Sequence, residues 1–155
     1  MKLENQVCSL ELAKRLRELG VNKESFIRYY SYDGIEYELI YGIWHSIFHL
    51  SDQLNAYTAS ELLNMLPQWI NTGKDEPFNN FRFRLEKVNI CTGNTLESLS
   101  PHFVCNYYCD STECSGDNAF FQRKIIPKSF YDENPCNALA KIYIYLLENG
   151  LIKND

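Results

Sequence analysis

The chain has 155 residues, the length of one ordinary domain, and its 45% hydrophobic and 23% charged residues are near the average for globular proteins. This composition excludes a disordered chain, a collagen-like repeat and a long coiled coil. The net charge of −5 argues against non-specific binding to nucleic acid, which requires clustered cations. We therefore expect a single domain over residues 1–155 whose partner is not nucleic acid.

The location is expected to be cytoplasmic, without membrane contact. The first residues lack the apolar stretch of a signal peptide, and no run of about 18 apolar residues is present to cross a membrane. The cysteines are therefore expected to be reduced thiols rather than disulfides. They are Cys8, Cys91, Cys105, Cys109, Cys114 and Cys136.

The first helix is predicted to begin after Ser9, which can accept a hydrogen bond at the N-cap. Leu12 and Leu16 follow at helical spacing, and Gly20 is typical of the residue that ends a helix. A short second helix or turn is predicted over residues 23–29. Helix, glycine turn and short helix together are similar to a helix-turn-helix.

Two further helices carry clear end signals. Thr58 with Glu61 forms the pattern of a capping box, and Pro67 is expected to end or bend that helix, with one further turn over residues 68–70. Asn134 followed by Pro135 predicts the start of the last helix. Its buried stripe is expected to consist of Leu139, Ile142, Leu146 and Leu147.

Strands are expected where apolar and polar residues alternate, at residues 35–41, 81–88, 102–109 and 119–126. Asp33-Gly34 predicts a hairpin turn before the first of them, residues 42–50 could form a strand or a helix, and residues 110–118 are expected to be a loop. Pro127 is expected to stop the last strand. Together these elements predict an α+β fold with a small antiparallel or mixed sheet covered by about three helices.

Three segments, residues 9–21, 57–67 and 137–152, resemble a group of short proteins encoded by gut-type bacteria and their phages. All three segments are capped helix cores, and together they cover about a quarter of the chain. The resemblance implies a shared α+β fold and a phage or prophage setting. The group has no established activity, so the resemblance implies no functional residue.

The densest set of metal-ligand residue types is His102, Cys105, Cys109 and Cys114. Zinc prefers four thiolate or imidazole ligands, and it is the one cofactor that the sequence suggests. On a strand, however, Cys105 and Cys109 would share one face while His102 would point to the other. A zinc site, buried cysteines acting as small hydrophobic residues, and a disulfide between two of them stay open as interpretations.

A second pair of imidazoles, His45 and His49, would share one helix face, where Asp52 could join them. A zinc peptidase motif would need a Glu where Ser46 stands, so the general base is missing. A position at the edge of the core is the alternative interpretation.

Nucleophilic catalysis would need a Cys near a His and an orienting group, with Cys8, Cys105 and Cys136 as the candidates. The sequence contains no nucleophile elbow, phosphate loop or dinucleotide fingerprint.

Aromatic residues make up 14% of the chain, with 11 Tyr and 9 Phe. Tyr is enriched both in strands and at interfaces, so the excess indicates either ordinary cross-strand pairs or an exposed binding face. The leading hypothesis is a non-enzymatic interaction or adaptor protein that binds a protein partner, or itself, through an aromatic sheet surface. The alternatives are a zinc-dependent regulator or enzyme and a helix-turn-helix-like nucleic-acid regulator.

Overall fold

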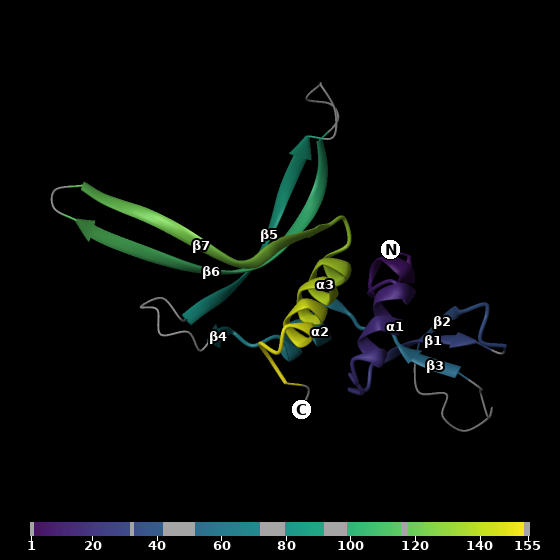
Figure 1. Cartoon of the computed structure of the whole chain (residues 1–155). Helices are drawn as coiled ribbons and strands as arrows, with labels where there is room; N and C mark the ends of the chain where they lie inside the picture. The colour runs from purple at the N-terminus through teal and green to yellow at the C-terminus, as the bar shows by residue number, and fades with distance from the viewer. Residues whose placement is uncertain are drawn as a thin grey trace. The chain divides into compact units, whose positions relative to one another are not determined.

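A computed structural model describes residues 2–31, 33–41, 52–71, 80–91, 99–115 and 118–153 (Figure 1). It has an α+β fold and two compact units, one of residues 1–66 and 134–155 and the other of residues 67–133. The predicted fold class is confirmed, and the described ranges contain three α-helices and two antiparallel sheets. Whether the chain behaves as one domain stays a prediction. Among the described residues, no helix has both the length and the apolar character that membrane crossing requires.

The first unit begins with a short 3-10 helix, η1 (Leu3–Asn5), and the helix α1 (Leu10–Glu18). The side chain of Ser9 accepts the N–H of Leu12, as the sequence predicts. Gly20 has a φ of +82°, a conformation that a side chain would strain, and the N–H of Val21 donates to the carbonyl of Leu16 at 3.0 Å. The predicted start and end of this helix are therefore confirmed.

The other two helices also follow their end signals. Thr58 and Glu61 form the complete capping box of α2 (Ala59–Met65), which ends before Pro67. Asn134 caps α3 (Pro135–Glu148) by accepting the N–H of Cys136 at 2.9 Å. The predicted stripe residues Leu139, Ile142 and Leu146 are fully buried, and Leu147 is half-buried. Burial of each such side chain contributes about 1.5–3 kcal/mol.

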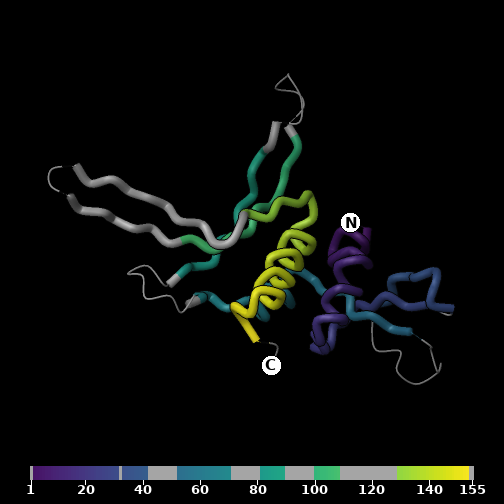
Figure 2. The backbone as a smooth tube through the Cα atoms, viewed as in Figure 1, coloured from purple at the N-terminus to yellow at the C-terminus, as the bar shows by residue number. Residues whose placement is uncertain are grey.

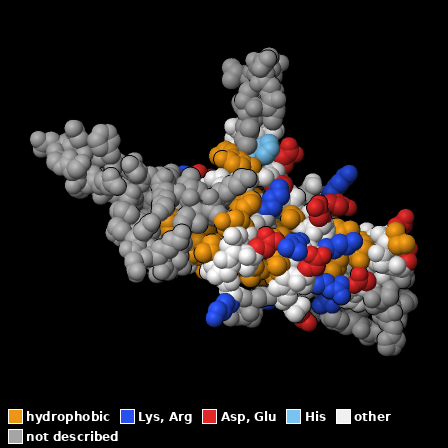
Figure 3. All heavy atoms as spheres, viewed as in Figure 1, with side chains coloured by type: hydrophobic (Ala, Val, Ile, Leu, Met, Phe, Trp, Pro, Cys, Tyr) orange, Lys and Arg blue, Asp and Glu red, His pale blue; other side chains and the backbone are white. Residues whose placement is uncertain are grey.

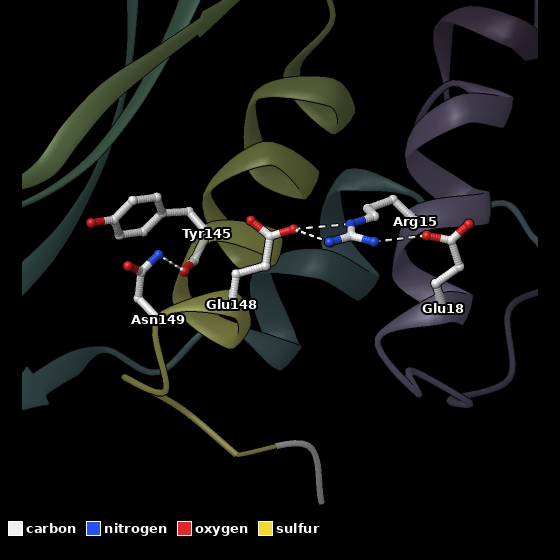
Figure 4. Close-up of polar contacts among 5 residues, drawn as sticks. All are labelled: Arg15, Glu18, Tyr145, Glu148 and Asn149. Atoms are coloured by element: carbon white, nitrogen blue, oxygen red, sulfur yellow. Dashed lines mark hydrogen bonds and ion pairs between the residues drawn. The ribbon is translucent and has the colours of Figure 1, made fainter.

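The N-terminal and C-terminal helices lie side by side, although most of the chain separates them (Figures 1 and 2). Arg15 on α1 bonds Glu148 on α3 at 2.6 Å and Glu18 on its own helix at 2.8 Å (Figure 4). These side chains are exposed to solvent, so the pairs contribute little to stability. On the face in view in Figure 3, Lys and Arg side chains are likewise interspersed with Asp and Glu side chains.

The sheet of the first unit has the order β2-β1-β3, from β1 (Ile27–Ser31), β2 (Glu38–Tyr41) and β3 (Asp52–Asn55). The predicted turn joins β1 to β2: the Asp33 carboxylate accepts the N–H groups of Ile35 and Glu36, and Gly34 has a φ of +77°. One face of this sheet is its core face, because Ile27 and Tyr29 there are buried.

Residues 23–29, predicted as a short helix or turn, contain no helix. Residues 21–26 form neither helix nor strand, and β1 follows directly. Burial explains the difference, because Ile27 and Tyr29 pack on one face of a central strand that is paired on both edges. The second helix that a helix-turn-helix motif requires is therefore not present at residues 23–29.

The second unit contains a four-stranded sheet of order β4-β5-β6-β7. Its strands are β4 (Trp69–Asn71), β5 (Asn80–Cys91), β6 (Leu99–Ser115) and β7 (Asn118–Asp132). The helical turn predicted at residues 68–70 is wrong, because Trp69 and Ile70 pair with β5 instead. The predicted strands at 81–88, 102–109 and 119–126 are confirmed, and each is longer than predicted.

Two boundaries in the second sheet differ from the sequence prediction. Residues 110–115 continue β6 rather than forming a loop, since each pairs with β7. Pro127 does not stop β7, because the register with β6 shifts between Cys105 and Tyr107 and leaves the proline in an irregular stretch. The prediction for residues 42–50 lies outside the described residues.

Candidate functional site

The predicted zinc ligands are divided between the two faces of β6. In the regular pairing with β5, His102 lies opposite Val88 and Cys105 opposite Leu85, so the two ligand candidates point to opposite sides. The ring of His102 lies 3.2 Å from the carbonyl of Ser100, and Cys105 is fully buried. The side chains of Cys109 and Cys114 lie outside the description.

No group of three or more His, Cys, Asp and Glu side chains that could hold a metal ion occurs in the described part of the chain. His45 and His49 lie outside it. Asp52, their predicted third partner, accepts hydrogen bonds from Tyr37 and Arg17, each at 2.5 Å. The Tyr37 hydrogen bond, followed by that of Arg17, lowers the pKa of Asp52.

The three candidate nucleophiles whose side chains are described are buried thiols. Burial raises the pKa of Cys8 and of Cys105 to about 12 and that of Cys136 to about 11. Because the thiolate is the reactive species, such thiols are nearly unreactive at neutral pH. This favours the interpretation of these three cysteines as small hydrophobic residues.

A small polar cavity of about 120 Å³ lies in the first unit between α1 and β3. Its lining includes Arg17, Asn22, Gln53 and Asn55. The volume is far below the roughly 300–1,000 Å³ of pockets that hold drug-sized ligands. Arg17 is held at this cavity by its ion pair with Asp52, so the cavity is a polar gap with room for a few water molecules beside a structural ion pair.

The most distinctive exposed feature is a surface of the second unit that we call the arginine–aromatic face, formed by Trp69, Arg82, Arg84 and Tyr108. Trp69, Arg82 and Tyr108 lie opposite one another in register on β4, β5 and β6. The guanidinium of Arg82 lies 5.8 Å from the ring centre of Trp69, and that of Arg84 lies 5.6 Å from the ring centre of Tyr108. Trp69 is 52% exposed.

The strand alternation explains why these side chains share one face. Residues Phe81 and Phe83 alternate with Arg82 and Arg84, so the phenylalanines point to the opposite side. Phe81 is 1% exposed, and the ring of Phe83 lies 5.3 Å from that of Tyr107. The sheet therefore carries the arginine–aromatic face on one side and a packed apolar layer on the other.

That apolar layer is anchored by a buried hydroxyl. Tyr107, which is fully buried, donates from its hydroxyl to the carbonyl of Pro67 at 2.6 Å. Pro67 lies two residues before Trp69 in the chain. This bond ties β6 to the segment that leads into β4 and so helps to position the exposed indole.

The chemistry of the face is that of hydrogen-bond donors held over flat apolar rings. A guanidinium stacked on a ring keeps its N–H edges available for carboxylate or phosphate oxygens. Arg84 also bonds Glu86, whereas Arg82 has no acidic partner among the described residues. Such Trp, Tyr and Arg groups are the residue types that contribute most to protein interfaces.

The sequence prediction missed this face because it placed Trp69 in a helical turn. The alternation at residues 81–88 did place Arg82 and Arg84 on one side of a strand. Only the pairing of β4 and β6 with β5 brings Trp69 and Tyr108 beside them.

No protein-family model, curated protein or solved structure matches the chain.

Proposed function

We propose that this protein is a non-enzymatic interaction module that binds a protein partner through the arginine–aromatic face. The observation that carries the proposal is the exposed indole of Trp69 with the Arg82 guanidinium over its ring, 5.8 Å from the ring centre. Burial of an indole against a partner removes a large apolar area from water. An arginine at the same place can bond carboxylates of that partner in a bidentate way.

The buried layer beneath the face supports the proposal. Affinity is highest where the binding residues are held in place before the partner arrives. Trp69 and Tyr108 lie on either side of Arg82 in the sheet. The neighbours of Arg82 along β5, Phe81 and Phe83, pack on the opposite face of the sheet. The backbone that carries these side chains is therefore held in place before a partner binds.

The test is capture of partners by the tagged full-length chain from a lysate of expressing cells, read by mass spectrometry. Trp69→Ala and Arg82→Ala should each weaken capture of a stoichiometric partner by about tenfold or more, as truncation of an interface hot spot does. Phe26→Ala and Lys23→Ala are the matched controls, since both residues are exposed in the first unit. They should leave capture unchanged.

A partner captured equally by wild type and both face variants would contradict the proposal, and so would a preparation with no stoichiometric partner. Co-purified RNA or DNA would point to a different class of partner, since bases also stack on aromatic rings. Binding of a labelled single strand that weakens steeply with salt would then replace the proposed protein partner.

The phage or prophage setting that the resemblance implies stays a prediction. The genomic neighbourhood of the gene tests it: genes for phage structure or integration beside it would support the setting.

A further inference from the structure

The strand β2 is one edge of the sheet in the first unit, and its outer side has no partner strand among the described residues. Its sequence is apolar and aromatic, with Leu39, Ile40 and Tyr41 in succession. An exposed edge of this kind is a template for another strand.

The direction of the backbone groups on β2 follows from one hydrogen bond. The N–H of Ala56 donates to the carbonyl of Ile27 at 2.9 Å, so the backbone groups of Ile27 point toward β3. Backbone groups alternate sides along a strand, so those of Arg28 point toward β2 and bond its register partner, Ile40. The N–H and carbonyl groups of Leu39 and Tyr41 therefore point outward.

The side chain of Tyr41 indicates that the edge is incomplete. Tyr41 lies on the core face of the sheet, where its register partner Ile27 is buried, yet Tyr41 itself is 70% exposed. No strand among the described residues lies beyond β2 to cover it. A further strand would extend the apolar core face over this ring.

We propose that the missing strand is β2 of a second copy of this chain, paired antiparallel about a two-fold axis at Leu39. Leu39 then lies opposite the partner's Leu39, Tyr37 opposite the partner's Tyr41, and Glu38 opposite the partner's Ile40. The outward-pointing residues form the hydrogen-bonded pairs in this register, as the direction of their backbone groups requires. A two-fold axis at Glu38 instead would set two carboxylates opposite each other, which is unfavourable.

Charge complementarity favours the same arrangement. Arg28 lies beside Ile40 in the sheet, and the partner's Glu38 lies on the other side of that isoleucine. Both residues are on the face opposite the core face. The Arg28 guanidinium bonds Gln53 on β3 at 2.9 Å, so it attracts the partner's Glu38 from two strands away and does not pair with it directly. The two-fold axis repeats this arrangement, so the interface has two such attractive charge pairs.

Light scattering and sedimentation of the full-length chain test the proposal over about 10 µM to 1 mM, since so short an interface binds weakly. The wild-type mass should rise toward twice the monomer mass. Leu39→Pro removes an outward N–H, which an edge strand tolerates, together with a half-buried apolar side chain, and should stay monomeric. Ile40→Pro is the matched control, because it removes an N–H that bonds β1 and should disrupt the fold itself.

Tyr41→Lys provides a second variant with an unaltered backbone, and an edge lysine opposes strand addition. It should weaken dimerisation about tenfold or more while circular dichroism and melting stay as in wild type. If Leu39→Pro does not fold, the strength of dimerisation of Tyr41→Lys tests the proposal in its place. A wild type that stays monomeric over the whole range, or a dimer that is unaffected by the folded variants, would overturn the proposal.

Cross-linking tests the register directly. Leu39→Cys should form a covalent dimer on mild oxidation, because hydrogen-bonded antiparallel partners have Cα atoms about 5.5 Å apart, within the range of disulfides. Glu11→Cys, at an exposed position of α1, is the control for random collision. Equal cross-linking of the two variants would overturn this register.

Discussion

The carboxylate of Glu61 joins α2 to the segment before β1, and its removal is the sharpest test of the packing of the first unit. It accepts the N–H of Thr58 at 2.7 Å and the hydroxyl of Thr58 at 2.8 Å. It also lies 3.1 Å from the hydroxyl of Ser25 and accepts the N–H of Phe26 at 3.3 Å. One side chain therefore caps a helix and holds a loop.

Glu61→Ala should lower the free energy of unfolding by about 2–4 kcal/mol. Loss of a helix cap costs about 1 kcal/mol, and hydrogen bonds to a charged group contribute about 1.5–3 kcal/mol. For a chain of this length the loss corresponds to a fall of roughly 5–15 °C in Tm. Urea denaturation followed by circular dichroism measures the free energy, with an unchanged slope confirming that the native state is compact.

Glu61→Gln should cost less, about 1 kcal/mol, because its amide oxygen can still complete a capping box while its NH₂ group faces the N–H of Phe26. Glu24→Ala removes an exposed loop carboxylate nearby and should leave the stability within about 0.5 kcal/mol of wild type. A Glu61→Ala protein as stable as Glu24→Ala would refute the reasoning.

Two further predictions concern ionisable groups. The lowered pKa of Asp52 stabilises the folded state above the ordinary carboxyl pKa of about 4, and this contribution is lost as the pH falls through the folded-state value. Tyr37→Phe removes the first cause of that shift, so the unfolding free energy of the variant should depend less steeply on pH between about 5 and 2 than that of wild type. Equal slopes would contradict this. With its pKa raised to about 12, Cys8 should react with iodoacetamide at pH 8 on the order of a thousand times more slowly in the native protein than in denaturant, as should Cys105. Peptide mapping by mass spectrometry measures both rates, and comparable labelling in the two states would show that these thiols are accessible.

The helices were predictable because their signals are local. The cap of Ser9, the capping box of Thr58 and Glu61, and the pair Asn134-Pro135 each act within one helical turn. A short-range hydrogen bond needs only residues that are neighbours in the chain. The predicted boundaries of these helices therefore agree with the structure.

The errors fall where pairing between distant segments decides the local structure. Trp69 follows a helix and a proline, and it is a strand residue only because β5 lies beside it. Residues 110–115 have a polar, loop-like composition, yet their pairing with β7 makes them part of a strand. Strand propensity depends on such neighbours more than helix propensity does.

For the candidate sites, too, local features were predictable from the sequence and features that depend on strand pairing were not. By itself the sequence determined that His102 and Cys105 would lie on opposite faces of a strand, because the side-chain period of two is a property of the backbone. It also determined that Arg82 and Arg84 would share a face. Only the tertiary structure decided that Trp69 and Tyr108 lie beside them and that β2 is an edge strand of the sheet formed by the described residues. The order and register of strands arise from contacts between residues far apart in the chain.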